Sequence, residues 1–145
     1  MNAIAGTTAA LLTGVGLLHA VWTVSPWPWK TQLDLAHAAM GWTKDEPPPG
    51  RWFIPACLAV TAALTAAGYA LLLRAGIWTS PFPGWMVTTA TWTVAGVLLA
   101  RAAWGFVDPS SGSADTPAVY RRLNRRVYAP LCLVLGGLTT VVAAS

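Results

Sequence analysis

Residues 51–74 read "RWFIPACLAVTAALTAAGYALLLR", with one arginine at each end and no charged side chain between them. At a rise of 1.5 Å per residue, a helix over Trp52–Leu73 would be about 33 Å long, close to the thickness of the hydrocarbon core of a bilayer. This segment therefore predicts a membrane-spanning helix. Three more segments of similar length and composition predict three further spans: Ile4–Val24, Trp85–Trp104 and Val127–Ala144.

The composition supports a membrane location. The chain is 55% hydrophobic and only 10% charged, whereas soluble domains carry about a quarter charged residues. Nine tryptophans fit as well, because indole rings favour the headgroup region. The first apolar segment has no basic region before it and no small-residue cleavage site after it, so we expect a retained helix and not a signal peptide. The fold class predicted is all-α, a four-helix transmembrane bundle that forms a single domain over residues 1–145.

The distribution of basic residues predicts the orientation. Eight of the nine lysines and arginines lie in or beside two loops, residues 25–51 and 105–126, and the ninth is Arg74. Because positively charged loops stay in the cytoplasm, we expect both loops inside and both termini outside a bacterial inner (plasma) membrane. The net charge of +4 is thus explained by topology, and a nucleic-acid partner is not expected.

One phrase occurs twice. "RWFIPACL" (51–58) and "RVYAPLCL" (126–133) share an arginine, an aromatic residue, a proline, a cysteine and a leucine at the same spacing, and each holds one of the two cysteines. The preceding spans also match, since "GVGLLHAVW" (14–22) and "GVLLARAAW" (96–104) agree at five of nine positions. The double match favours an internal duplication over chance.

The duplication predicts two tandem helical hairpins, about residues 1–75 and 76–145, related by a pseudo-twofold axis along the membrane normal. The clearest difference between the two copies is His19, which aligns with Arg101. Ionisable groups inside a span are costly and seldom face lipid. Both side chains are therefore candidates for a site. The alternatives are an imidazole bonded to a helix carbonyl, and an arginine that extends to the interface.

We expect the cytoplasmic ends of the spans to form a cationic pocket rich in hydrogen-bonding groups. The candidate catalytic residues are His19 and Tyr128, which could transfer a proton or orient a ligand. Because an arginine fork binds phosphate or carboxylate, the expected ligand is an amphiphile: a phospholipid, an isoprenoid phosphate or a fatty acyl compound. Arg121 and Arg122 can be explained by topology alone. The candidate substrate-binding residues are Arg101, Asp108, Asn124, Arg125 and Arg126.

Several other chemistries lack the residues they need. There is no Cys-x-x-Cys motif, and Cys57 and Cys132 are expected to be helix-packing residues. No cluster has metal-ligand spacing, so neither a metal nor a cofactor is expected. A short interfacial helix is predicted over residues 30–42, where Asp34 and His37 share a face. That pair could orient an imidazole, or it could simply be the solvated side of the helix.

Four stretches form a recognisable combination: "GLLHAVWTVSPWPW" (16–29), "LDLAHAAMG" (33–41), "RAAWGF" (101–106) and "RRLNRRVYAPLCLVLGG" (121–137). Together they resemble a bacterial family of small four-helix integral membrane proteins catalogued as a domain of unknown function. The likeness covers most of the chain and implies the four-helix fold, but no activity. In the family pattern an aspartate often stands where this chain has Asn124, which weakens an acid or base role at that position.

Two functional hypotheses remain. The first is a protein that binds or transforms a membrane lipid or isoprenoid-type molecule at the cytoplasmic ends of the helices. The second is a non-catalytic membrane subunit or interaction partner, which includes a homodimer or a heteromeric complex. A small transporter is less favoured, because the spans contain no aspartate or glutamate and their outer halves offer mainly threonine.

Overall fold

The structure is a computed structural model that describes residues 1–43, 45–108 and 115–145, and over these residues all regular secondary structure is helical. Lys44 and residues 109–114, which belong to the two predicted cytoplasmic loops, lie outside the described residues. The elements are α1 (Asn2–Trp22), α2 (Gln32–Ala39), α3 (Phe53–Arg74), α4 (Gly84–Val107), α5 (Ala118–Leu123), the π-helical turn η2 (Asn124–Tyr128) and α6 (Ala129–Ala144).

Four helical segments are long and apolar enough to cross a membrane: α1, α3, α4 and the continuous α5–η2–α6 segment. About 70% of the residues in the most apolar window of each are not buried inside the protein, as expected when lipid covers the outer faces. The chain is a multi-pass membrane protein, and the prediction of an all-α fold with four spans is confirmed.

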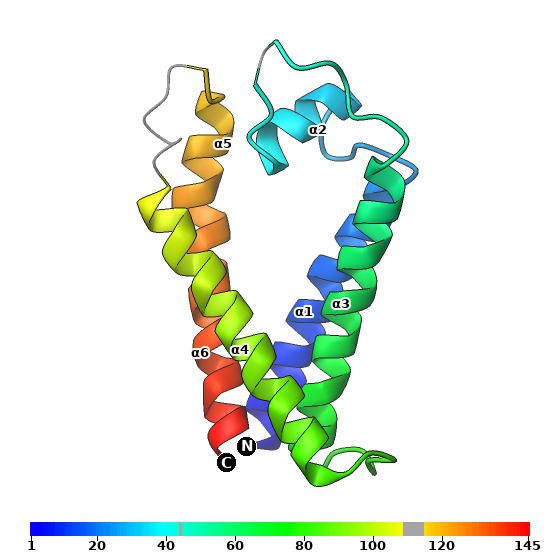
Figure 1. Cartoon of the computed structure of the whole chain (residues 1–145), viewed down its shortest axis with the longest axis vertical. Coiled ribbons are helices and arrows are strands. Elements are labelled where there is room, and N and C mark those ends of the chain that lie inside the picture. Colours follow the sequence, from blue (N-terminus) through cyan, green and yellow to red (C-terminus); the bar gives the residue numbers. More distant parts are fainter. Residues whose placement is uncertain (44, 109–114) are drawn as a thin grey trace.

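The four spans pack as two pairs, α1 with α3 and α4 with α6. Figure 1 shows the α1–α3 pair and the α4–α6 pair meeting at the end that holds both termini and diverging toward the end that holds α2 and α5. Each pair corresponds to one expected hairpin. The duplication itself, its pseudo-twofold axis and the domain limits stay predictions.

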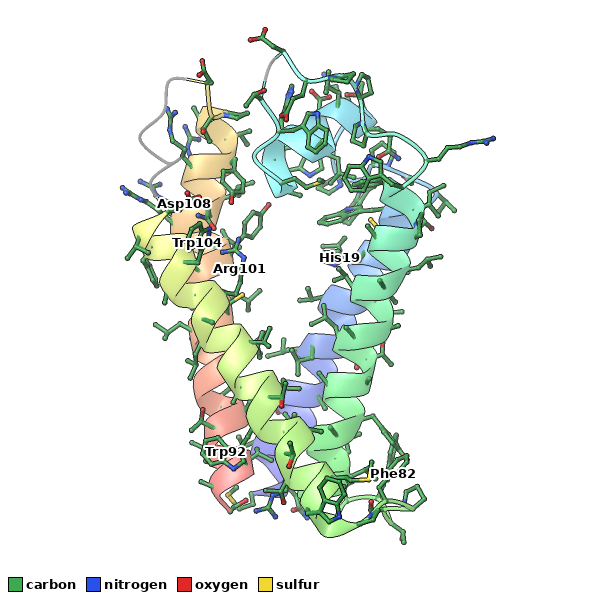
Figure 2. The ribbon with its side chains drawn as sticks, viewed as in Figure 1. His19, Phe82, Trp92, Arg101, Trp104 and Asp108 are labelled. Carbon is green, nitrogen blue, oxygen red and sulfur yellow. The ribbon has the colours of Figure 1, made fainter. Side chains whose placement is uncertain are left out.

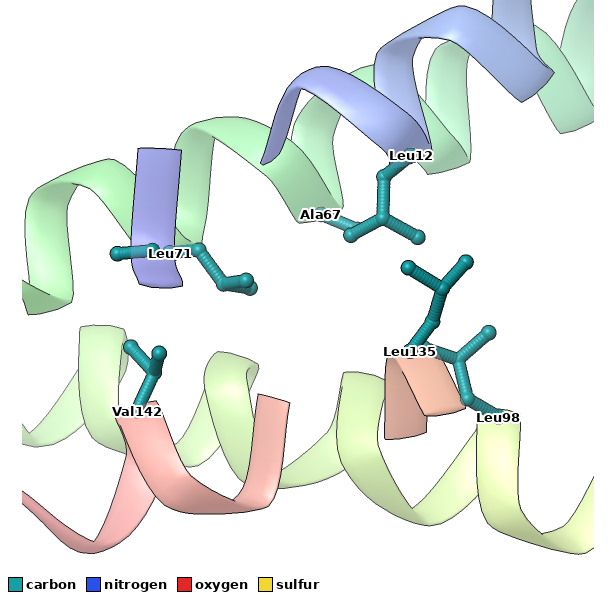
Figure 3. Packing of buried hydrophobic residues seen from close by; sticks show 7 residues of the cluster. Leu12, Ala67, Leu71, Leu98, Leu135 and Val142 are labelled. Carbon is teal, nitrogen blue, oxygen red and sulfur yellow. The ribbon is translucent and has the colours of Figure 1, made fainter. Parts of the chain in front are cut away.

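The two pairs meet in an aliphatic core. Leu12 of α1 and Leu71 of α3 are fully buried, as is Val142 of α6. Figure 3 shows the side chains of one pair directed toward Leu98, Leu135 and Val142 of the other. Arg74 adds a polar link at the same end, because its Nη2 donates to the carbonyl oxygen of Ala143 at 3.1 Å.

Within the α1–α3 pair, a glycine allows close contact. A Cβ at Gly68 would lie 3.0 Å from the carbonyl oxygen of Ala9, so only a hydrogen fits there. Thr61 of α3 donates its hydroxyl to the carbonyl of Gly16 at 2.9 Å. Small residues and hydroxyl groups are typical of helix contacts in membranes, where apolar side chains gain little by leaving lipid for protein.

The fourth span begins earlier than predicted. The sequence suggested a start near Val127, but the helix begins at Ala118, so Pro130 lies inside a continuous helical segment and not in a first turn. The π-helical turn directly before Pro130 relieves the clash that proline would cause in a regular α-helix. Pro55, by contrast, does lie in the first turn of α3. The two repeated phrases therefore have different local structures.

The predicted short helix is present as α2. Thr31 and Asp34 form a capping box at its N-terminus, since each side chain accepts from the other's backbone N–H. Its buried face includes Leu35, which packs with Trp22 and Phe53 in a second apolar cluster. This cluster holds α2 against the α1–α3 pair.

Candidate functional site

His19 and Arg101 face each other across the two diverging pairs. His19 lies seven residues, about two turns, beyond Leu12 of the core, and Arg101 lies seven residues beyond Val94, which packs on the same core. Both side chains therefore continue the inner faces of their helices. Figure 2 shows them on the facing sides of the two pairs, at a similar level along the long axis.

Arg101 is held by a buried amide. Its Nη2 donates to Oδ1 of Asn124 at 3.1 Å, and Nδ2 of Asn124 donates to the carbonyl of Gly105 at 3.1 Å. The side chain of Asn124 is fully buried. Gly105 is required here, because a Cβ at that position would lie only 3.0 Å from Nη1 of Arg101. The three residues form one chain of hydrogen bonds that orients the guanidinium.

Among the described residues, the charge of Arg101 has no partner of opposite sign. Its Nη1 is buried and donates no hydrogen bond to any of the described residues. None of the carboxylates in the described part of the chain forms an ion pair with it. Asn124 supplies a dipole but no negative charge. A guanidinium within a span thus keeps an unsatisfied donor and an uncompensated charge, which is costly in a membrane.

His19 lies on a pocket beneath α2. Its Nδ1 is 2.9 Å from the carbonyl oxygen of Val15, four residues earlier, and its ring contacts the ring of Trp22 at a centroid distance of 4.7 Å. This hydrogen bond to a helix carbonyl is the purely structural alternative for His19 that the sequence analysis named. It requires a proton on Nδ1, which leaves Nε2 for a ligand. The pocket has a volume of about 220 Å³, and its lining includes His19, Met40, Phe53, Cys57 and Val60.

Tyr128 connects the two pairs at their open end. Its hydroxyl donates to the carbonyl of Ala38 in α2 at 3.1 Å. It also lies within electrostatic range of Arg101. A second contact lies nearby, because the ring of Tyr120 packs against Gly41, where a Cβ would meet ring atoms at 3.0 Å. Since α2 belongs to the α1–α3 side, these contacts bridge both pairs above His19 and Arg101.

The other candidate residues take separate positions. Asp108 is buried at the C-terminal end of α4. Arg125 and Arg126 are exposed on η2, although the turn also holds the buried Asn124. The structure thus brings together Arg101, Asn124 and Tyr128, with His19 on the opposing helix. It directs the two arginines of η2 outward.

The Asp34–His37 pair does not form the arrangement that would orient an imidazole. Both hydrogen bonds shown for the Asp34 carboxylate come from Thr31. Nε2 of His37 is buried without a hydrogen-bond partner among the described residues. The described residues also contain no group of three side chains suited to hold a metal ion.

Sequence reasoning missed Gly105 and Ala38, which contribute backbone carbonyls to this region. Gly105 carried a usable signal, because it follows Arg101 by four residues and therefore lies beside it on the helix surface. Ala38 carried none, since its contact with Tyr128 joins residues that are ninety positions apart.

A family model described as "Protein of unknown function (DUF3995)" matches residues 12–139. The chain belongs to this family. The match includes His19, Arg101, Asn124 and Tyr128, so the resemblance expected from the sequence is confirmed. The chain matches no curated protein and no solved structure.

Proposed function

We propose that this protein binds an amphiphile with an anionic head, of the lipid or isoprenoid type, between its two helix pairs. The observation that carries the proposal is the state of Arg101: a guanidinium within a span, oriented by Asn124, with a buried donor and no ion-pair partner in the described residues. A phosphate or carboxylate oxygen would supply both the missing acceptor and the missing charge.

The contacts that join the two helix pairs at both ends favour a ligand that enters from the membrane. The α1–α3 and α4–α6 pairs are joined by the aliphatic core at one end and by Tyr128, Tyr120 and α2 at the other. Access to the inner faces is therefore from the side, where lipid would lie. An amphiphile reaches such a site without leaving the bilayer.

His19 is the residue we assign to any chemical step. With Nδ1 bonded to Val15, its Nε2 would accept a proton when the ring is neutral and donate one when it is charged. Tyr128 would act as a positioning residue, because its hydroxyl is engaged with α2 and its ring lies near Arg101. Arg125 and Arg126 would attract anionic headgroups toward the open end.

The proposal includes an orientation. We place the protein in a bacterial inner membrane with both termini outside and loops 25–51 and 105–126 in the cytoplasm. The bias of basic residues supports this orientation. The site would then lie at the cytoplasmic side, below the inner headgroups.

A non-catalytic role as a partner subunit is the second candidate. Gly6 and Gly14 of α1 and Gly137 of α6 have no atom within 4 Å of the position of an added Cβ. A helix of another chain could approach closely at these glycines. A defined heteromeric or homodimeric band after crosslinking in native membranes, with unchanged function of His19→Ala, would favour this candidate over ligand binding.

The test uses the full chain in a neutral maltoside detergent, titrated with dodecyl phosphate and with dodecanoate and followed by native mass spectrometry. Arg101→Gln removes the charge. Asn124→Asp keeps the hydrogen-bond acceptor for Arg101 and adds an internal counter-charge. We expect both variants to bind at least about tenfold more weakly, the value of one charge-assisted hydrogen bond.

Arg122→Gln is the matched control, because Arg122 is exposed and its loss changes the net charge equally. Its affinity should equal that of the unaltered protein. Far-UV circular dichroism confirms that each variant is folded. Undiminished binding by a folded Asn124→Asp protein would contradict the proposal.

A further inference from the structure

An apolar groove runs between α3 and α4 on the membrane-exposed flank of the protein. One cavity of about 440 Å³ and another of about 220 Å³ share Ala66, Ala70, Met86 and Ala90 in their linings. Because the two cavities share these residues, they adjoin along α3 and α4, and we call them together the α3–α4 groove. Its far end is lined by Phe82 and Leu73.

The groove leads toward Arg101 and His19. On α4, Val94 lines the groove and Arg101 lies two turns further along the same face. On α3, Ala63 lines the groove, and Val60, one turn away, lines the pocket that contains His19. From Val60 to Leu73 the helix rises by about 20 Å. The lining of the groove on α4 ends at Val94, about 10 Å along the helix from Arg101, whose charge has no ion-pair partner among the described residues.

The walls of the groove suit one hydrocarbon chain. In the larger cavity the lining on α3 consists of alanines, among them Ala63, Ala66 and Ala70, and Ala63 and Ala66 are exposed. The groove is therefore shallow and open to the bilayer along its length. A chain that moves from lipid into it gains little hydrophobic free energy, since both surroundings are apolar. Selectivity among ligands must therefore come from contacts with their head groups.

The charge of the site indicates the chemical class of the ligand's head group. Arg101 contributes one permanent positive charge, and the lining of the His19 pocket includes no arginine or lysine. A single charge matches a monoanion better than a doubly charged phosphate. We infer that the ligand is a long-chain carboxylate, whose head binds Arg101 and whose single hydrocarbon chain lies along the α3–α4 groove. This inference rests on the proposed function and specifies its ligand.

The test uses the full chain in nanodiscs of zwitterionic lipid with two photoreactive probes. One is a hexadecanoate with a diazirine at its methyl end, and the other is an octanoate with the same group. The long probe should label the far end of the groove, at Phe82, Met86 or Leu73, whereas the short probe should label residues near Val60 and Ala63. Peptide mass spectrometry identifies the labelled residues.

Ala66→Trp fills the groove halfway between Val60 and Leu73, at an exposed position that lines both cavities, where a larger side chain needs no repacking of the core. We expect it to reduce labelling of the far end by the long probe at least about tenfold and to leave binding of the short probe unchanged. Ala62→Trp is the control, because Ala62 is outside the linings of both groove cavities. Labelling of this variant by both probes should equal that of the unaltered protein.

The outcomes separate the two proposals. If Ala66→Trp leaves far-end labelling unchanged, or if hexadecanol with the same photoreactive group labels equally well, the groove holds annular lipid and the inference is wrong. Crosslinks from the groove to a second copy of the chain would also overturn it. The proposed function would survive these results as long as Arg101→Gln abolishes binding of the short probe. It would fail if Arg101→Gln binds both probes normally.

Discussion

At the scale of single residues, Gly105 determines whether Arg101 can be held. Three groups converge on its α-carbon: the methyl group of Ala129, the guanidinium of Arg101 and the amide of Asn124. Gly105 also supplies the carbonyl that accepts from Asn124. One residue without a side chain thus allows α4 to approach α6 and leaves space for the hydrogen-bonded chain.

We therefore predict that Gly105→Ala destabilises the protein by about 1–3 kcal/mol, the usual cost of overpacking. The added Cβ would lie 2.7 Å from Cβ of Ala129 and 3.0 Å from Nη1 of Arg101, so the helices must separate or the guanidinium must move. Thermal unfolding in detergent, with binding of dodecyl phosphate measured in parallel, checks both effects.

Gly96→Ala on the same helix is the control, because no atom lies within 4 Å of its added Cβ. Alanine favours helix over glycine by up to about 1 kcal/mol in water, so this variant should be neutral or slightly more stable. Equal losses for the two variants would show that Gly105 has no special packing role.

At the scale of elements, α2 is a small helix whose position depends on contacts with both pairs. Its capping box and its buried Leu35 secure it to the α1–α3 side. The hydroxyl of Tyr128 secures it to the α4–α6 side. An isolated helix of eight residues is unstable in water, so these contacts maintain it.

Tyr128→Phe should loosen α2 without unfolding the protein. It removes one hydrogen bond, worth about 0.5–1.5 kcal/mol, and the amide hydrogens of α2 should exchange about two- to tenfold faster. Tyr120→Phe is the control, because no hydrogen bond to the Tyr120 hydroxyl is found in the described part of the structure. Hydrogen exchange read by mass spectrometry distinguishes the two, and equal exchange in both variants would refute the bridging role of Tyr128.

Elements were predictable from the sequence where composition alone decides them. The apolar segments predicted the four spans. The positions of His19 and Arg101 on the inner faces follow from the helix period only with the structure, which shows Leu12 and Val94 in the core. The start of the last span at Ala118 was missed because "YRRLNRR" was treated as a charged loop, although arginine and leucine are good helix formers. The capping box of α2 was a readable signal, since Thr31 and Asp34 have the required spacing.

The features that the sequence did not predict depend on contacts between residues that are far apart in the chain. The bonds from Arg101 to Asn124 and from Tyr128 to Ala38 join segments separated by 23 and 90 positions. No local pattern encodes either of them. The π-helical turn η2 also escaped prediction, because it depends on how the chain accommodates Pro130 while Asn124 remains buried.

At the scale of the whole molecule, Arg74 helps to hold the two pairs together at the end with the termini. Arg74→Gln should lower the free energy of unfolding by about 1–2 kcal/mol, because the carbonyl of Ala143 loses a charged donor. Arg51→Gln is the charge-matched control at an exposed position. A denaturation series in mixed micelles compares them, and an equal midpoint for both variants would show that the link is not structural.

The orientation of the whole molecule decides which leaflet supplies the ligand. Eight of nine basic residues lie in or beside the two loops at the open end, while Figure 1 shows both termini at the other end. Positive loops resist translocation, so the site should open toward the inner leaflet. We test this with single cysteines at Ser145 and Asp45 in a chain in which Cys57 and Cys132 are replaced by alanine.

A membrane-impermeant maleimide should label Ser145→Cys in intact cells, after disruption of any outer membrane, and Asp45→Cys only once the inner membrane is permeabilised. Both positions are exposed, so access to the reagent depends on the side of the membrane and not on burial. The reverse pattern would place Arg101 near the outer leaflet, and the ligand would then have to be sought among molecules that reach the protein from outside. Labelling of both positions in intact cells would mean that the chain adopts both orientations, which a bias of eight basic residues to one opposes.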